Sequence, residues 1–312
     1  MSVLVDLIVM LGMLVVVPAG LRLAGAPELD RIRRLWPLLA VPGAVALWLP
    51  RGGPATILAG CYALGAVLLA LHAPPRLLRK VRASAAHRTA EIALFTALVA
   101  PSVAATALVA ERSGHALFGF GLGTLALTVP HFHFAGFAAA LIAGLVCRVA
   151  DGPAGRFAAS SVPLGTLLVL IGYFIADWAE LAGAVVLTAG MWTVALLTWR
   201  TIRGSSRDRT TRMLFAVSSA VLVATMVLAL SWALGEAAGL PHPTLTWMAA
   251  THGLGNALGF ALCSVLAWRR LQDRPEQAPP DRPRTGRPPA DPALTTSVRT
   301  DPPLTGLKDR TS

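Results

Sequence analysis

The histidines of the segment Pro130-His131-Phe132-His133-Phe134 are the side chains of this chain with the clearest potential for chemistry. They stand where a long apolar run begins, and an imidazole in hydrocarbon is costly enough to indicate function. Neutral imidazole binds metals, and it exchanges protons near neutral pH. The segment therefore predicts a ligand or proton site. Its alternative is one histidine that faces the headgroups while the other hydrogen-bonds a carbonyl.

A metal site at these histidines depends on the backbone. Residues two apart in an α-helix point about 200° from each other, so His131 and His133 reach one ion only from an extended segment. Pro130 permits an extended lead-in as well as the first turn of a helix. With His252 as a third neutral ligand, such a site would suit Zn²⁺, and imidazole also suits Cu and haem iron.

A second polar segment, Thr251-His252-Gly253-Leu254-Gly255-Asn256, lies near the other end of the apolar region. His252 and Asn256 are four residues apart, so they share one helix face. Gly255 and Gly259 have the GxxxG spacing, which predicts helix packing at close approach. We interpret His252 and Asn256 as hydrogen-bond partners between helices or, if the glycines bring them against the first segment, as part of its site.

Apolar runs of membrane-spanning length recur from residue 3 to residue 268 and must position both segments. About 20 apolar residues cross the hydrocarbon core, and these runs do not alternate with a period of two. We therefore predict an all-α fold, a polytopic helical transmembrane bundle of about nine spans, with eight to ten compatible with the pattern. The spans are expected at 3–22, 36–50, 54–72, 91–110, 131–150, 162–177, 180–199, 213–235 and 245–268.

The glycine-rich stretch near 116–130 decides the number of crossings. Two crossings between 116 and 150 would place the five arginines of 200–212 outside, against the rule that short basic loops stay in the cytoplasm. We expect one crossing there, preceded by a re-entrant or interfacial piece. The chain is then a multi-pass protein of the cytoplasmic membrane, with its N-terminus outside and its C-terminus in the cytoplasm. Tryptophans at predicted span ends, including Trp36, Trp232 and Trp268, agree with this topology.

This topology gathers polar side chains in the outer leaflet. Glu180 opens the seventh span on the same side as His131 and His252, and it joins them as a candidate. The candidates for binding an ion or a proton are His131, His133, His252, Asn256 and Glu180. The metal alternative uses His131, His133 and His252, and no catalytic residue is assigned.

The end of the chain differs in composition. From Leu271 onward it is rich in Pro, Arg, Asp and Thr and has too few large apolar residues to fold. We expect a transmembrane domain over residues 1–270 and a disordered cytoplasmic tail over 271–312. The net charge of +11 mostly reflects loop arginines. The lipid bilayer is thus the expected partner, no nucleic acid is expected, and protein partners are left open.

At its two histidine segments the chain resembles the YndJ-like family of bacterial multi-pass membrane proteins. The resemblance rests on His131-Phe132-His133-Phe134-Ala135-Gly136-Phe137 and on His252-Gly253, Asn256-Ala257 and Gly259-Phe260. The family commonly has tyrosine where this chain has Phe134, which implies that no phenolic hydroxyl is essential there. The family has no established activity, so the resemblance implies only that both segments form one signature.

Three functions are open on these residues. The first is a small transporter or permease-like protein with a His/Glu site in the outer leaflet. The second is a metal- or haem-dependent membrane enzyme, and the third is a non-catalytic membrane sensor or assembly factor. We prefer the first, because neither HExxH nor the histidine boxes of membrane hydroxylases occur in the chain.

Overall fold

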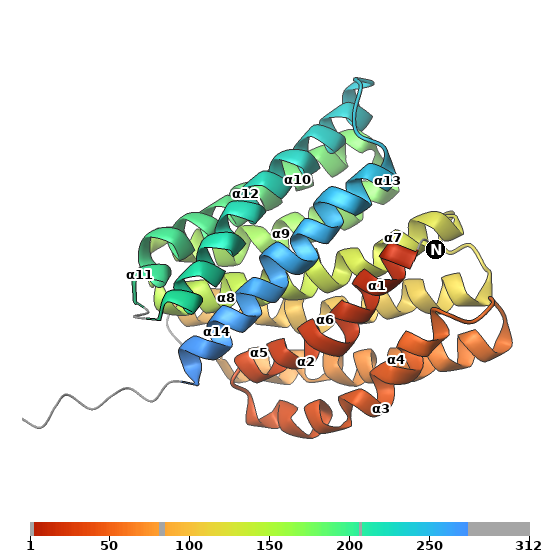
Figure 1. The fold of residues 1–312 in the computed structure, drawn as a ribbon, viewed down its shortest axis with the longest axis horizontal. Helices are drawn as coiled ribbons and strands as arrows, with labels where there is room; N and C mark the ends of the chain where they lie inside the picture. The colour runs from red at the N-terminus through yellow and green to blue at the C-terminus, as the bar shows by residue number, and fades with distance from the viewer. Residues whose placement is uncertain (1–2, 81–84, 206–207, 274–312) are drawn as a thin grey trace, which may run out of the picture. The chain divides into compact units, whose positions relative to one another are not determined.

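The computed structural model describes residues 3–80, 85–205 and 208–273, and most of these residues are helical (Figure 1). Within them, eight helical stretches are long and apolar enough to cross a membrane. The helix α3 (Asp30–Ala46) adds a ninth, shorter stretch of 17 residues, which is close to the lower limit for a spanning helix. The prediction of an all-α polytopic bundle is confirmed.

Several stretches change helix type along their length. In chain order, the elements are α1 (Val3–Leu11), η1 (Gly12–Val16), α2 (Val17–Leu23), η2 (Pro27–Leu29), α3 (Asp30–Ala46), α4 (Gly53–Leu71), α5 (Ala73–Lys80), α6 (Ala85–Ser113), α7 (Leu122–His131), η3 (Phe132–Ala138), α8 (Ala139–Val149), α9 (Pro153–Ile175), α10 (Asp177–Leu197), η4 (Thr198–Ile202), α11 (Arg203–Ser205), α12 (Arg209–Ala238), α13 (Leu245–Met248), η5 (Ala249–Gly253), η6 (Gly255–Leu262) and α14 (Cys263–Gln272). The segment η2 is a 3₁₀ turn, and the other η segments are π-helical.

The stretch from 116 to 150 contains one span-length helix, Leu122–Val149, as expected. The glycine-rich piece before it divides in two. Its first part is a tight turn in which the backbones of Leu117 and Phe120 exchange hydrogen bonds of 3.3 and 2.9 Å. The helix begins at Leu122 and runs on into the span, so the prediction of a re-entrant or interfacial piece is wrong for residues 122–130. Phe118 and Gly119, at the centre of the turn, both have positive φ (54° and 85°), as a type I′ turn requires.

The helices α9 and α10 begin earlier than predicted and form a close pair. Pro153 occupies the first turn of α9, where it costs no hydrogen bond, so the helix starts there and not at residue 162. Ala176 alone is extended and reverses the chain before α10. A Cβ on Gly172 would lie 2.5 Å from the backbone of Glu180, so the glycine permits this approach. The close contact fixes Glu180 in the first turn of α10.

Buried ion pairs join the turn after α3 to the end of α6. The Glu111 carboxylate is fully buried and pairs with Arg112 and, at 2.7 Å, with Arg51. The Arg112 guanidinium also donates hydrogen bonds to the carbonyls of Leu47 (3.2 Å) and Leu49 (3.3 Å). A buried carboxylate is costly unless it is paired, so Glu111 needs these arginines. Arg51 and Arg112 therefore have a structural role at this end of the bundle.

Three tryptophans expected at the membrane boundary are instead inside the bundle. Trp36 is 1 % exposed and donates its Nε1–H to the carbonyl of Met13, within η1, at 2.8 Å. Trp268 is 3 % exposed and packs edge-on against Phe215, and Trp232 lines a cavity. The boundary rule uses the position along a span, whereas burial depends on the helix face, which the sequence alone does not fix.

The predicted tail lies almost wholly outside the described residues. Leu271 and Gln272 complete α14, Asp273 follows it, and the description ends there. The division into a domain over 1–270 and a tail over 271–312 therefore stays a prediction.

Candidate binding cavity

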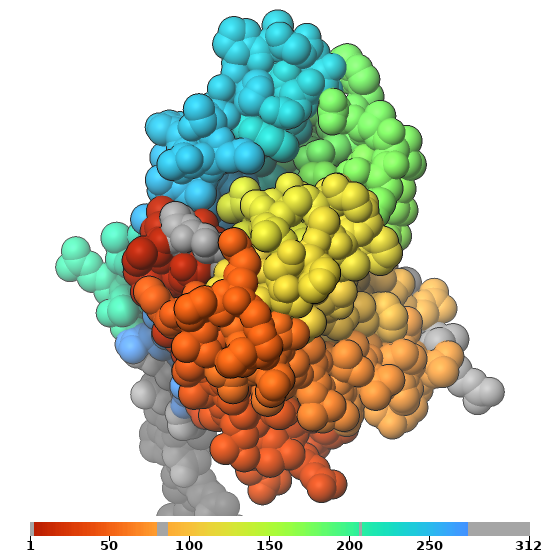
Figure 2. All heavy atoms as spheres, turned by 90° about the vertical axis from the view of Figure 1, so that its right-hand side faces the viewer, coloured from red at the N-terminus to blue at the C-terminus, as the bar shows by residue number. Residues whose placement is uncertain are grey.

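A cavity of about 330 Å³ lies among α1, α7–η3, α9, α10, α12 and α13–η6. Figure 2 views the molecule from the right-hand side of Figure 1, where segments that wall the cavity, from α7 (yellow), α9–α10 (green) and α12–α13 (light blue), lie next to one another. Most of the wall is apolar. Its polar side chains are Thr124, Thr128, His131, Tyr173, Glu180, Trp232, His252 and Asn256. The cavity thus brings together four of the five predicted ion- or proton-binding residues.

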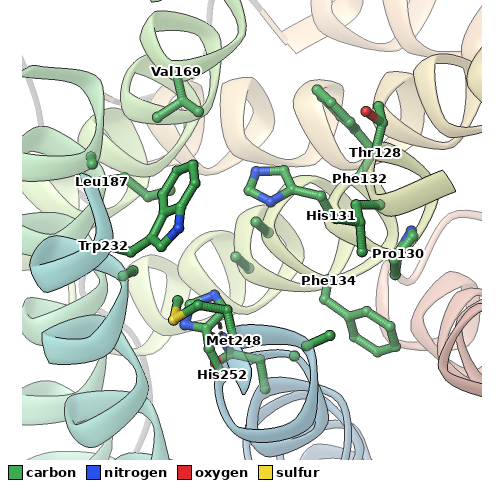
Figure 3. A pocket seen from close by; sticks show the side chains of 18 of the residues that line it. Thr128, Pro130, His131, Phe132, Phe134, Val169, Leu187, Trp232, Met248 and His252 are labelled. Carbon is green, nitrogen blue, oxygen red and sulfur yellow. Dashed lines mark hydrogen bonds between the residues drawn. The ribbon is translucent and has the colours of Figure 1, made fainter. Parts of the chain in front are cut away.

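His131 faces the cavity. Its imidazole and the indole of Trp232 lie on opposite sides of the space, and His252 and Met248 lie on a third side (Figure 3). The ring touches that of Phe132, with 5.7 Å between centroids. Within the described part of the chain, the imidazole of His131 makes no hydrogen bond, so its nitrogens are free to bind a ligand.

His133 has the opposite environment. It is 0 % exposed, and its Nδ1 lies 2.7 Å from the carbonyl oxygen of Val129. Because a carbonyl only accepts, Nδ1 carries the hydrogen, and Nε2 accepts a hydrogen bond from the hydroxyl of Tyr62 at 2.5 Å. The two rings stack with 5.7 Å between centroids. Both nitrogens of His133 therefore have partners inside the protein.

The two histidines point apart because the segment is helical from Leu122 onward. His131 ends α7 and His133 lies in the first π-helical turn of η3. Gly12 in η1 makes room for His133, since a Cβ there would lie 2.9 Å from the Cβ of His133. His133 is not among the residues that line the cavity, and the set His131, His133 and His252 is not brought together. Nowhere in the described ranges do three or more His, Cys, Asp or Glu side chains form a group that could hold a metal ion.

His252 and Asn256 form a closed hydrogen-bond network with α12. The Nδ1–H of His252 donates to the carbonyl of Thr225 at 2.8 Å, and its Nε2 accepts from the amide of Asn256 at 3.1 Å. The Thr225 hydroxyl donates to Oδ1 of Asn256 at 2.8 Å. A Cβ on Gly255 would lie 2.9 Å from Thr225, and one on Gly259 only 2.6 Å from Val221, so these glycines permit the close packing of η6 on α12.

Glu180 is half-buried in the cavity wall, and within the described residues it has neither a hydrogen bond nor an ion pair. The carboxylates of Asp177 and Glu236 are near enough to interact with it electrostatically. His242, the basic side chain at this end of α12, is 2.9 Å from Glu236 and so is already paired. The region around Glu180 therefore carries uncompensated negative charge.

A second cavity of about 300 Å³ shares a wall with the first. Thr124, Thr128, Phe132 and Tyr173 line both. The outer side of this second cavity is aromatic: Phe120 packs edge-on against Phe174, with ring centroids 5.2 Å apart. It adjoins the first cavity on the side of α6 and α9.

The sequence interpretation missed Trp232, Tyr62 and Thr225. Trp232 was taken for a membrane-boundary residue, although its buried Nε1–H has no hydrogen-bond partner and belongs to the cavity wall. A usable signal existed for the tyrosines: the chain has only two, and both Tyr62 and Tyr173 fall in predicted spans and contact candidate residues or line the cavity. Nothing in the sequence distinguishes Thr225 from the other hydroxyl residues of its span.

A profile described as YndJ-like protein matches residues 7–260, a range that includes both histidine segments and every element of the cavity wall except the first residues of α1. The chain belongs to this family. No curated protein and no solved structure gives a match.

Proposed function

We propose that this member of the YndJ-like family is a transporter or permease-like protein whose substrate or coupling ion binds in the cavity between α7, α10 and α13. The observation that carries the proposal is the convergence of polar side chains from distant stretches on a single space within the bundle. The residues concerned are His131, Glu180, His252 and Asn256. Transporters commonly build their sites from such irregular segments at membrane depth.

The type of helix around the cavity supports the proposal. Three of the stretches that line it, η3, η5 and η6, are π-helical. π-Helical turns are rare and occur frequently at functional sites, because the widened turn redirects side chains and loosens backbone hydrogen bonds. The cavity wall is therefore built partly from a helix type that is common at functional sites.

We propose an orientation with the N-terminus outside, the C-terminus in the cytoplasm and the cavity in the outer half of the cytoplasmic membrane. Arginines are dense at the turns of one end of the helices, as in 200–212. The opposite end contains Arg51 and Arg112, and both pair with Glu111. The two exceptions to the basic-loop rule thus share a buried carboxylate, which reduces their combined charge from +2 to +1.

The metal-enzyme alternative is not proposed, because its three histidines do not share a site. His133 pairs with Tyr62, away from the cavity, and both nitrogens of His252 already have partners. The closed networks of His133 and His252 are compatible with a sensor or assembly factor, so the transport proposal depends chiefly on His131 and Glu180. A test must show whether the cavity opens to both sides of the membrane.

Cysteine accessibility tests this without knowledge of the substrate. Cys61, Cys147 and Cys263 are replaced by alanine, and a single cysteine is placed at Ala184, which lines the cavity. A membrane-impermeant maleimide is then applied to right-side-out and inside-out vesicles. A transporter alternates between two conformations, so we expect Ala184→Cys to react from both sides.

Two matched variants complete the experiment. Ala143→Cys is fully buried in α8 and should react from neither side, whereas Ala176→Cys, in the exposed turn between α9 and α10, should react from outside only. Reaction of Ala184→Cys from one side alone would contradict transport, and so would no reaction at all. Reaction of Ala176→Cys from the inside would reverse the proposed orientation.

A further inference from the structure

The charges around the cavity suggest which ligands it favours. Among the described residues that line it there is no lysine or arginine, and Glu180 is the one acidic side chain. Asp177 and Glu236 add negative potential nearby. An unpaired carboxylate within a membrane-embedded wall is unfavourable unless a cation or a proton accompanies it. A bound anion would meet repulsion from all three carboxylates.

The rest of the wall is suited to an organic cation. Hard inorganic cations prefer several charged oxygen ligands, and among the described residues Glu180 is the one carboxylate that lines the space. Rings and thioethers form much of the rest of the cavity wall, and tryptophan is the side chain whose ring attracts cations most strongly. The side chains that carry these rings and thioethers are Phe132, Tyr173, Met191, Met226, Trp232 and Met248.

One hydrogen-bonding group of the wall fits the same ligand. The imidazole of His131, which faces the cavity, has a nitrogen able to accept an N–H. A volume of about 330 Å³ is at the lower end of the range for small-molecule sites, so the ligand is small. The adjoining cavity is also largely apolar, which suits a molecule that partitions into lipid.

We infer that the cavity binds a small lipophilic organic cation, whose positive charge is neutralised by Glu180 and whose body lies against Trp232 and Tyr173. This inference rests on the proposed function for the use of the site, but binding itself does not require transport. In the complex, Glu180 recognises the positive charge, Trp232 and Tyr173 contact the cation, and His131 accepts an N–H group where the ligand has one.

A pair of probes that differ in charge alone tests the inference. Benzyltrimethylammonium is cationic, and neopentylbenzene has nearly the same shape without the charge. Binding of each to the detergent-purified full chain is measured by calorimetric titration. We expect the wild type to bind the cation at least about tenfold more tightly than the neutral probe, because a half-buried carboxylate interacts strongly with a cation in contact.

Two variants identify the group responsible. Glu180→Gln keeps the shape of the side chain. It should weaken binding of the cation at least about tenfold and leave the affinity for the neutral probe unchanged. Glu236→Gln alters an exposed carboxylate outside the cavity wall, so it should weaken binding of the cation no more than about threefold. Circular dichroism and thermal unfolding establish that both variants are folded.

The inference is overturned if the wild type binds both probes equally, if it binds neither, or if Glu180→Gln binds the cation as well as the wild type does. These results are separate from those of the accessibility experiment. Cation binding together with accessibility from one side would contradict transport and support the inferred ligand class. Accessibility from both sides together with preference for the neutral probe would support transport and contradict the inferred ligand class.

Discussion

His131 and His133 are two residues apart and have opposite environments. His133 is fully buried, with one nitrogen on the carbonyl of Val129 and the other on the hydroxyl of Tyr62. His131 faces a cavity opposite Trp232 and has no hydrogen-bond partner within the described chain. The comparison shows that a pair of histidines in one motif need not share a role: here one closes a packed interface and the other remains free for a ligand.

Helix geometry causes this difference. Since the segment is helical, His131 and His133, two residues apart, point in nearly opposite directions and so meet different parts of the protein. On one side, Gly12 and Tyr62 bring α1–η1 and α4 against the ring of His133. On the other side, α10 and α12 leave a space of about 330 Å³ in front of His131. The depth of a residue in the membrane is therefore a weaker guide to function than the face it occupies.

The largest expected effect is on stability. His133→Ala removes a buried ring and leaves the hydroxyl of Tyr62 without its partner, so we expect a loss of about 3 kcal/mol in unfolding free energy. His131→Ala should change stability by less than about 1 kcal/mol, because the ring borders a cavity. Thermal or denaturant unfolding in detergent measures both. Equal losses in the two variants would remove the distinction between these histidines.

The close approach of η1 to His133 gives the next effect. In Gly12→Ala, the new Cβ would lie 2.9 Å from both Cβ and Cγ of His133, and the shift this requires should cost about 1–3 kcal/mol. Gly60→Ala is the matched control, because nothing lies within 4 Å of the added atom in α4. It should leave stability unchanged or raise it by up to about 1 kcal/mol. A Gly12→Ala protein as stable as the Gly60→Ala protein would mean that the η1–η3 contact is loose.

The smallest effect concerns the network of His252. Thr225→Val removes the hydrogen bond to Asn256 while keeping the side-chain shape, and we expect a loss of about 0.5–1.5 kcal/mol. Thr193→Val is its control, since the Thr193 hydroxyl donates only to the carbonyl of Ala189 in its own helix. Unfolding measurements on both variants separate the interhelical bond from the local one. If the two substitutions cost the same, His252 and Asn256 are not held by α12.

Much of the architecture follows from the sequence, because hydrocarbon forces its apolar runs into helices. One span between 116 and 150 was predicted from the arginines of 200–212, and this stretch contains one helix of spanning length, Leu122–Val149. The start of α9 was wrong: the span was expected from residue 162, whereas the helix starts at Pro153, a residue that suits the first turn of a helix. Apolar composition identifies a span better than it identifies the ends of a helix.

The site was predictable only in part, since side-chain partners depend on helix rotation. The gathering of His131, Glu180 and His252 on one side was expected from topology, and all three line one cavity. Tyr62 is 71 residues from His133, and no spacing rule connects them. Trp232 was misjudged for the same reason, because its position in the span predicts depth and not the face on which it lies.

Chemical modification of the two histidines tests the central claim most directly. Diethyl pyrocarbonate reacts with accessible neutral imidazole nitrogens, and tandem mass spectrometry of the peptide that contains both residues assigns the modified one. We expect modification of His131, protection of His131 by benzyltrimethylammonium, and no modification of His133 in the folded protein. Modification of His133 at a rate similar to that of His131 would contradict the division between a packed histidine and one that faces a binding cavity.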